Sequence, residues 1–246
     1  MSARLYFLSL SHPSQAARLM LERKGIEHEI VELVPAIHPI QLRLAGFSGT
    51  TVPALRLDGR RIQGSREISR ELERERPEPP LFPPEPERRR AVEEAEEWGD
   101  RAFQPIPRRL FRWALSTRDD LRAWMASEVM RMPAPHLIAT INAPIVRVLA
   151  RKSHADEQHV RADVEALPSM LDHVDDLIAS GVIGDEQPNA ADFQIGTTVW
   201  ALMALSDIKP LVAGRPAAEL AARLMPPMEL EVPSFLPSSW FEGVPA

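Results

Sequence analysis

Two serines, Ser11 and Ser14, flank Pro13 near the N-terminus of the chain. The pattern of Arg4–Leu8 predicts a strand before them, and the amphipathic pattern from Ala16 predicts a helix after them. A serine at such a junction caps the helix through its side-chain oxygen. A helix N-terminus also carries partial positive charge, so an anion is stabilised there, and a donated hydroxyl hydrogen bond adds to this.

The composition excludes several other kinds of chemistry. The chain has no cysteine, so disulfides, protein thiolates and cysteine-ligated metals are excluded. Its seven histidines form neither an H-E-x-x-H motif nor an i, i+4 pair on one predicted helix, so we expect no metal site. No phosphate-binding loop and no G-x-S-x-G motif occurs. The net charge of −6 argues against a broad nucleic-acid-binding face.

The hydropathy pattern predicts a cytoplasmic protein that does not enter a membrane. The longest apolar stretch, Phe193–Leu205, is about 13 residues long, whereas a membrane span needs roughly 20. The apolar run at the N-terminus is too short for a signal peptide.

The first 76 residues predict the element order β-α-β-α-β-β-α. After the first strand and helix, the expected elements are a strand at Glu29–Val34, a short helix at Pro39–Leu44, a hairpin of Val52–Leu57 and Arg61–Ile62 around Asp58-Gly59, and a helix at Ser65–Glu75. A parallel strand pair with a crossover helix, followed by an antiparallel hairpin, is a thioredoxin-like arrangement.

Six prolines between Pro77 and Pro86 predict a stiff, extended linker, because proline fixes φ and lacks an amide hydrogen. We therefore expect a thioredoxin-like domain at 1–76, a linker at 77–86 and an all-helical domain at 87–246. The expected helices are Glu87–Leu115, which Pro105 and Pro107 kink or break, Asp119–Met130, Ile138–Arg151, Asp156–Ser180, Ala190–Leu205 and Arg215–Leu224. The tail from Met225 to Ala246 is expected to be irregular but packed on the body, because it is rich in both proline and large apolar residues.

Over residues 3–205 the chain resembles the cytosolic glutathione transferase superfamily, and the first similarity is at Ser11. The family places a catalytic Ser, Tyr or Cys after strand one, commonly with an Arg seven residues beyond it; Arg18 puts Ser11 at that position. The resemblance implies that the Ser11 hydroxyl stabilises a bound thiolate, with His12 and Ser14 beside it. The alternative is that Ser11 or Ser14 only caps the helix and that His12 is an ordinary loop histidine.

The second similarity is Thr51-Val52-Pro53-Ala54-Leu55, which resembles the family's Val-Pro-Ala-Leu element with a cis Val-Pro bond. It implies that the backbone of Val52, held by Pro53, pairs with the backbone of a bound thiol peptide. The alternative is an ordinary proline at the start of a strand.

The third similarity is Gln63-Gly64-Ser65, where the family has an acid or Gln followed by Ser. It implies that Ser65 binds the γ-glutamyl carboxylate at a helix N-terminus, and the alternative is a plain helix cap. Gly64 stands where the acid that binds the γ-glutamyl ammonium is expected, and Gln63 and Glu67 are the candidate substitutes.

The fourth similarity is Asn189-Ala-Ala-Asp192, which resembles the family's capping box at the start of a buried helix.

Four arginines lie among aromatic residues on the kinked helix that lines the second-substrate pocket in the family: Arg101, Arg108, Arg109 and Arg112. An anionic substrate or product is one interpretation of this cluster. A salt-bridged helix face, with the aromatic residues in the core, is the other.

Two functions follow from the resemblance. The first is an enzyme that binds glutathione or another low-molecular-weight thiol and uses it to conjugate, isomerise or reduce a small-molecule electrophile. Its expected thiol-binding residues are Ser11, His12, Ser14, Val52, Pro53, Gln63 and Ser65, with Ser11 catalytic and no metal. The second is a non-enzymatic ligand-binding or interaction protein that has lost the thiol site, which the glycine at position 64 favours. Family members commonly dimerise, so the resemblance also implies a homodimer.

Overall fold

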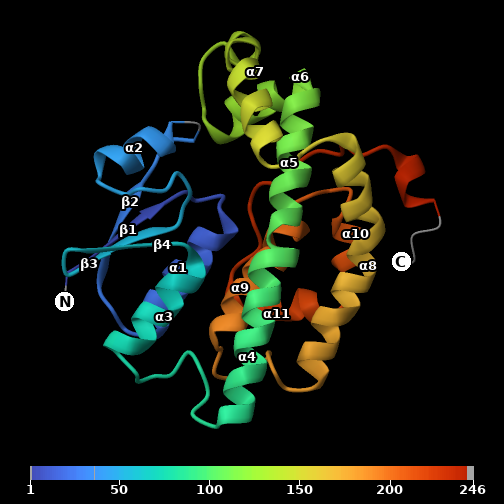
Figure 1. The fold of residues 1–246 in the computed structure, drawn as a ribbon. Coiled ribbons are helices and arrows are strands. Elements are labelled where there is room, and N and C mark those ends of the chain that lie inside the picture. Colours follow the sequence, from blue (N-terminus) through green and yellow to red (C-terminus); the bar gives the residue numbers. More distant parts are fainter. Residues whose placement is uncertain (1, 36, 243–246) are drawn as a thin grey trace.

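The N-terminal part of the chain folds as a four-stranded mixed sheet with helices on its faces (Figure 1). The computed structural model describes residues 2–35 and 37–242. The elements here are β1 (Ala3–Phe7), α1 (His12–Arg23), β2 (His28–Glu32), α2 (His38–Leu44), β3 (Ala54–Leu57), β4 (Arg60–Gln63) and α3 (Ser65–Glu75). The strand order is β2-β1-β3-β4; β1 runs parallel to β2 and antiparallel to β3, and β3 is antiparallel to β4. The predicted thioredoxin-like arrangement is confirmed.

Alternate side chains of β1 belong to two different cores, because successive residues of a strand point to opposite faces. Leu5 and Phe7 lie in the main core, which includes apolar residues of α1 and α3. Tyr6 lies in a smaller core with Leu42 of α2, and its ring meets the edge of Phe47 at 5.1 Å between centroids. The helices α1 and α3 therefore cover one face of the sheet, and α2 covers the other.

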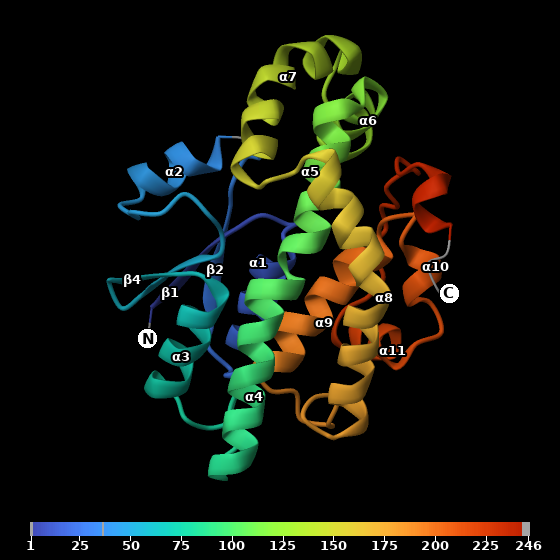
Figure 2. The same ribbon diagram turned by 45° about the vertical axis from the view of Figure 1, so that its right-hand side comes forward.

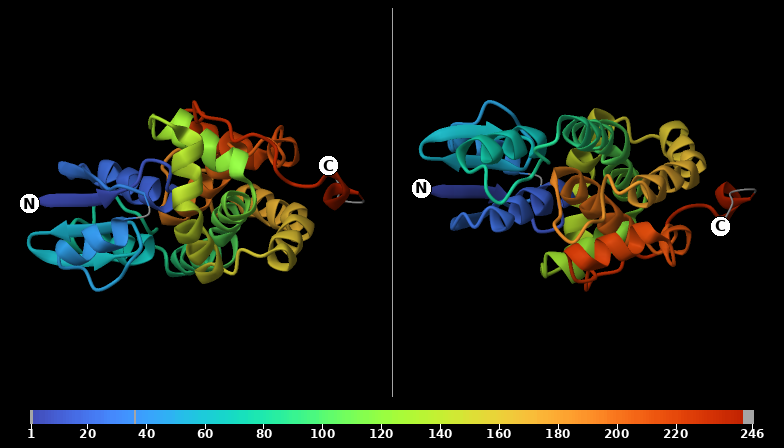
Figure 3. Two further views of the ribbon diagram at one scale, coloured as in Figure 1. Left: turned by 90° about the horizontal axis from the view of Figure 1, so that it is seen from above. Right: turned by 90° about the horizontal axis from the view of Figure 1, so that it is seen from below.

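The rest of the chain is mostly helical and lies beside the sheet, as the side view in Figure 2 and the views from above and below in Figure 3 show. Its elements are α4 (Pro86–Trp98), a π-helical turn (Gly99–Phe103), α5 (Pro105–Thr117), α6 (Asp119–Trp124), a second π-helical turn (Met125–Val129), α7 (Pro135–Lys152), α8 (Glu157–Ala179), α9 (Ala190–Met203), α10 (Lys209–Val212), α11 (Pro216–Leu224) and a 3-10 helix (Ser238–Phe241). Within residues 2–35 and 37–242, no helix is both long enough and apolar enough to cross a bilayer.

Helix α9 is the centre of the helical part and also packs on α1 of the α/β part. All residues from Ala190 to Leu202 are buried. The predicted capping box is confirmed: the side-chain oxygen of Asn189 accepts hydrogen bonds from the backbone of Ala191 and Asp192, and the Asp192 carboxylate accepts one from the Asn189 amide at 2.8 Å. The cap satisfies amides that a buried helix end would otherwise leave unpaired.

Residues 77–86 run between the two parts in close contact with both. Leu81 and Phe82 are buried. The Leu81 carbonyl accepts a hydrogen bond from the amide of Ala190, at the start of α9, at 2.9 Å. The guanidinium of Arg70 lies over the Phe82 ring, 4.2 Å from its centroid. This segment is therefore held by apolar packing and by hydrogen bonds, in addition to the stiffness of its prolines.

The interruption predicted in the long helix is present before Pro105, whereas Pro107 lies within the first turn of α5. Helix α4 ends at Trp98, and after the π-helical turn α5 begins at Pro105, a position where the missing amide hydrogen of proline costs little. Helix α10 and the 3-10 helix were not predicted. The tail packs on the body as expected: Trp240 is buried and its ring lies 5.2 Å from that of Trp113. Residues 243–246 of the tail lie outside the described residues.

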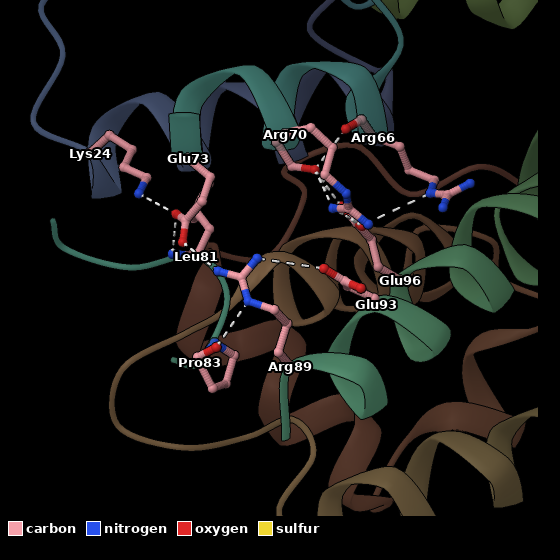
Figure 4. A network of polar contacts seen from close by, with 10 residues as sticks. Lys24, Arg66, Arg70, Glu73, Leu81, Pro83, Arg89, Glu93 and Glu96 are labelled. Atoms are coloured by element: carbon pink, nitrogen blue, oxygen red, sulfur yellow. Dashed lines mark hydrogen bonds and ion pairs between the residues drawn. The ribbon is translucent and has the colours of Figure 1, made fainter. Parts of the chain in front are cut away.

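A buried carboxylate connects the two parts (Figure 4). Glu96 of α4 is fully buried and accepts hydrogen bonds from the Ser69 hydroxyl at 2.6 Å and from the Arg70 guanidinium at 2.5 Å. The Arg66 guanidinium is 3.9 Å away. Burial raises the pKa of Glu96, and the three polar neighbours on α3 oppose this rise.

A second ion pair joins α1, α3 and the connecting segment (Figure 4). The side chain of Lys24 is fully buried, and its Nζ donates to the Glu73 carboxylate at 2.5 Å and to the Pro77 carbonyl at 3.1 Å. The same carboxylate accepts the amide of Leu81 at 2.9 Å. Glu73 therefore stabilises the start of the connecting segment against α3.

Replacing Glu96 should destabilise the fold. In Glu96→Ala, Ser69 and Arg70 lose their common acceptor in a buried place, so we expect the free energy of unfolding to fall by about 1–3 kcal/mol. Denaturant unfolding measures this. The control is Glu94→Ala on the exposed side of the same helix, whose effect should be close to zero. Equal effects of the two substitutions would contradict the assignment of Glu96 as a stabilising polar contact between the two parts.

Candidate functional site

Three segments meet at one end of the sheet because of the strand register. Tyr6 of β1 pairs with Ala54 of β3, and Ala54 pairs with Gln63 of β4. The end of β1, the start of β3 and the end of β4 therefore lie side by side. The segments that continue from them are Leu8–Ser11, Thr51–Pro53 and Gly64–Ser65, so the register brings together the places predicted for thiol binding.

Ser11 is the N-cap of α1. Its side-chain oxygen accepts a hydrogen bond from the Ser14 amide at 3.4 Å, near the upper limit for such a contact. Among the described residues, the Ser11 hydroxyl donates to no other group, and the residue is only half-buried. Ser14 is fully buried, and its hydroxyl has no hydrogen-bond partner among the described residues. Of the two serines, Ser11 is therefore the cap, and its hydroxyl proton is available to a ligand.

His12 is not a loop residue but the first residue of α1, and it is buried. Its Nε2 lies 3.1 Å from the backbone carbonyl of Gln104, just before α5. Because a carbonyl only accepts, Nε2 carries the hydrogen and donates. Burial, together with the positive charge of Arg108, lowers the pKa of His12 to about 3. The imidazole is therefore neutral at ordinary pH and ties the first turn of α1 to the helical part.

The amide of Gln63 is used in holding the loop that contains Val52. Its side-chain oxygen accepts from the Gly49 amide at 3.0 Å, and its nitrogen donates to the Thr51 carbonyl at 2.7 Å. The Val52–Pro53 bond is cis, as predicted. Among the described residues, no hydrogen bond occupies the backbone N–H or C=O of Val52. Gln63 thus positions the loop and leaves the Val52 backbone open to a ligand.

Gly64 and Ser65 form the start of α3. Gly64 has φ of 104°, a conformation that favours glycine and explains why no acid stands at this position. Ser65, the first residue of α3, is buried. A Cβ built on Gly64 would lie 2.3 Å from an Oε of Glu67, so the Glu67 carboxylate fills the space that a side chain at position 64 would enter. The N-terminus of a helix is a favourable place for that negative charge.

A further carboxylate, which the sequence did not single out, lies in the same region. Asp100 is in the π-helical turn and accepts from the side chain of Gln104 at 3.2 Å. Burial raises the pKa of Asp100; the negative charge of Glu67 adds to the rise, and the positive charges of Arg66 and Arg108 oppose it. Asp100 therefore lies within electrostatic reach of α3 and of α5. Its place after α4 offered no motif by which to select it.

The four arginines of the predicted cluster differ in their partners. Arg101 pairs with Glu97 at 2.8 Å, and Arg109 pairs with Asp163 at 3.3 Å. Arg108 donates to the Gln104 side-chain oxygen at 2.6 Å, and Arg112 donates to the Ser153 hydroxyl. Within the described part of the chain, neither Arg108 nor Arg112 has a carboxylate within 4.0 Å. The cluster is thus two salt-bridged arginines and two without an acidic partner.

No group of three or more His, Asp or Glu that could hold a metal ion occurs among residues 2–35 and 37–242. The site consists instead of a capped helix N-terminus, an open backbone segment, a second helix N-terminus with a carboxylate, and two arginines. This combination offers hydrogen-bond donors and charges for a polar ligand that carries both an acid and an amine.

Comparison with known proteins agrees with this fold. Residues 5–80 match the family model for the glutathione S-transferase N-terminal domain. A glutathione S-transferase from Rhodospirillum rubrum F11 is 21% identical over 97% of both chains, with a TM-score of 0.60. FzlA from C. crescentus is 21% identical over 91% of this chain and 88% of its own, with a TM-score of 0.57.

A maleylacetoacetate isomerase from Anaeromyxobacter dehalogenans 2CP-1 is 19% identical over 91% of this chain and 89% of its own, with a TM-score of 0.54. Its structure holds dicarboxyethyl glutathione and citrate in the active site. No curated protein sequence matches the chain. The comparisons thus show that residues 5–80 match the glutathione S-transferase N-terminal domain and that the whole chain has the fold of these structures.

The buried neutral imidazole of His12 should make stability depend on pH. The unfolded chain binds this proton below its ordinary pKa of 6.5, whereas the folded protein binds it only near pH 3. Stability contributed by His12 is therefore complete above pH 6.5 and is lost as the pH falls, by up to about 1.4 kcal/mol per pH unit. In His12→Gln, which keeps a donor for the Gln104 carbonyl, this slope should be absent.

The measurement is the free energy of unfolding by denaturant between pH 7 and pH 5. The control is His136→Gln, because that imidazole is exposed to solvent. Identical pH slopes for His12→Gln and the unchanged protein would show that His12 is not held neutral by the fold.

Proposed function

We propose that this protein is an enzyme that binds glutathione or a similar small thiol and transfers it to a small electrophile. The observation that supports this most directly is the Ser11 hydroxyl, which lies at the N-terminus of α1 with its proton free to be donated. The partial charge of the helix end and a donated hydrogen bond both lower the pKa of a thiol bound there.

In the proposed binding mode the thiol peptide lies across the end of the sheet. Its backbone pairs with the open N–H and C=O of Val52, next to the cis Pro53. Its γ-glutamyl carboxylate binds at the N-terminus of α3 beside Ser65, and its ammonium binds the Glu67 carboxylate above Gly64. Gln63 acts indirectly by holding the Val52 loop, and His12 and Ser14 act by packing the first turn of α1.

The proposed reaction needs no group beyond the two substrates. The thiol loses its proton to solvent, and Ser11 stabilises the thiolate. The sulfur then forms a bond to an electrophilic carbon. In a substitution, the bond from this carbon to the leaving group breaks and its electron pair departs with that group. In an addition, the π bond of this carbon breaks and its electron pair moves to the neighbouring atom, which takes up a proton from solvent. The protein contributes a fixed geometry and a lowered thiol pKa.

A maleylacetoacetate isomerase of the same fold has been crystallised with glutathione in its active site. Glutathione is for this reason the first thiol to test. Isothermal titration calorimetry with glutathione decides whether the thiol site exists. Saturable binding with one site per chain supports the proposal, whereas no heat at millimolar glutathione or other small thiols would rule it out.

The second candidate function is that of a non-enzymatic protein that keeps this fold for binding a ligand or a partner. The specific observation in its favour is Gly64, which stands where the family has an acid. The two functions differ in whether thiol binding depends on Ser11 and Glu67.

We also propose that this chain forms a homodimer and that it is cytoplasmic. We propose the domain limits 1–76, 77–86 and 87–246.

Ser11→Ala tests the catalytic hydroxyl. Losing a hydrogen bond to a charged group costs about 1.5–3 kcal/mol, so the pKa of the bound thiol should rise by about one to two units and turnover should slow about tenfold to a hundredfold. Because the capping bond of Ser11 is long, the free energy of unfolding should fall by no more than about 1 kcal/mol. The thiol pKa is measured from the thiolate absorbance of the complex as a function of pH.

Ser9→Ala is the control for Ser11, because Ser9 lies in the same segment and its hydroxyl donates to Glu32 at 2.6 Å. Its thiol pKa and turnover should be those of the unchanged protein. Lost stability in Ser11→Ala with no change in the thiol pKa would make Ser11 a helix cap only.

Glu67→Gln tests the carboxylate above Gly64. If this carboxylate binds the γ-glutamyl ammonium, its loss should weaken glutathione binding about tenfold. Binding of N-acetylcysteine, which has no free ammonium, should not change. The control is Glu75→Gln in the last turn of the same helix, which pairs with Arg60. Equal affinity for glutathione in Glu67→Gln and the unchanged protein would remove Glu67 from the site.

A further inference from the structure

Two arginines of α5 have no acidic partner, although most arginines around them do. Arg101 and Arg109 are paired with carboxylates, and on α3 both Arg66 and Arg70 face Glu96. Arg108 and Arg112 are half-buried and donate only to neutral oxygens, those of Gln104 and Ser153. A desolvated guanidinium without a counter-charge is costly to the fold, so its presence calls for an explanation.

The two guanidinium groups lie on one side of α5, because residues four apart are neighbours on a helix face. That side faces the α/β part. Arg108 lies near His12, at the start of α1, and Arg112 lies near His38, at the start of α2, close enough in each case for the arginine to lower the histidine's pKa. Arg108 therefore lies beside the first turn of α1, which Ser11 caps.

The charges of the pair repel each other. Burial lowers the pKa of Arg108, and burial together with the charge of Arg108 lowers the pKa of Arg112 to about 10. The carboxylate whose charge acts on Arg108 is that of Asp100, which is more than 4.0 Å away and hydrogen-bonded to the Gln104 side chain. The hydrogen bonds of the pair go to neutral groups, so an incoming anion meets two positive charges that have no carboxylate within 4.0 Å and have spare N–H donors.

We propose that Arg108 and Arg112 bind the carboxylate of a small organic acid that is the second substrate. This rests on the proposed function, because it names the electrophile that meets the thiol. The planar fork of a guanidinium matches the two oxygens of a carboxylate, and an anion relieves the repulsion between the two charges. The substrate class is therefore an electrophile that carries a carboxylate, held with its reactive carbon toward Ser11.

The test compares two ligands of nearly equal size by calorimetry: S-(2-carboxyethyl)glutathione and S-propylglutathione. The unchanged protein should bind the carboxyethyl compound at least about tenfold more tightly, as expected for one charge-assisted contact. In Arg112→Gln and Arg108→Gln the preference should fall to about one. Arg112→Lys should keep part of it. Arg101→Gln, which removes a salt-bridged arginine of the adjoining π-helical turn, should keep all of it.

A second measurement uses succinate alone, and it does not depend on the thiol. Succinate should raise the melting temperature of the unchanged protein and of Arg101→Gln, but not that of Arg112→Gln. If neither glutathione conjugate binds, the proposed function fails, and this measurement alone then decides whether the arginines bind a carboxylate. A succinate shift that Arg112→Gln leaves intact, or no shift in any variant, overturns the inference.

A competing assignment is that Arg108 and Arg112 bind the C-terminal carboxylate of the thiol peptide. In that case Arg112→Gln would weaken unmodified glutathione as much as the carboxyethyl compound, and that result overturns the assignment to the second substrate. Equal affinity of the unchanged protein for the two conjugates overturns it as well.

Discussion

The position of α4 against α3 is the constraint on which the candidate site depends, and the buried carboxylate of Glu96 holds it. Ser69 and Arg70 both donate to this group. Eight residues further along, the carbonyl of Gln104 accepts from His12 at the start of α1. In addition to the ion pairs of α4 with α3 (Arg89–Glu73 and Glu97–Arg66), the α4–α5 segment is thus joined to the α/β part at Glu96 and at Gln104. Between them the π-helical turn passes close to α9, where a Cβ on Gly99 would lie 2.9 Å from the Ile195 side chain.

The two contacts explain why the site belongs to neither part alone. Ser11 and the cis-proline loop come from the α/β part, and Arg108 and Arg112 come from α5. Only the π-helical turn and Gln104 separate α4 from α5, so a contact at Glu96 also affects where α5 lies relative to α1. Because His12 is neutral, the second contact is a single hydrogen bond and not an ion pair, and it does not cancel the charge of Arg108.

Charge pairing separates structural arginines from the two that are available to a ligand. Of the 29 basic residues only three are lysines, so 26 are arginines. Composition alone therefore gives no reason to select any of them. The structure gives such a reason. The four arginines of the predicted cluster all stand within twelve residues, yet two of them have carboxylate partners and the other two have neutral partners. This difference depends on Asp163 of α8 and Ser153 after α7, which are far away in sequence.

Much of the fold could be predicted from the sequence because its signals are local. The Asp58-Gly59 turn, the α3 helix and the Asn189 capping box are each encoded within a few neighbouring residues, and each is present. The site could be predicted only in part. Gln63 was a candidate ligand group by its position, but its amide is used by the backbone of Gly49 and Thr51, which no local pattern reveals. His12 was one of seven histidines, and its burial depends on α5, some 90 residues later.

The glycine at position 64 shows how a missing motif residue and a missing function differ. The backbone there has φ of 104°, where an L-residue is strained, so glycine is the residue that this turn favours. A carboxylate is nevertheless present, because Glu67, in the first turn of α3, reaches back over the glycine. Gly64 was the main reason to favour a protein without a thiol site, and that reason loses force once the acid is found one turn further on. The choice between the two functions then depends on Ser11, whose hydroxyl has an acceptor role in the fold but no acceptor of its own among the described residues. A cap needs only the oxygen, so the proton of Ser11 is the part of this site that the fold does not use.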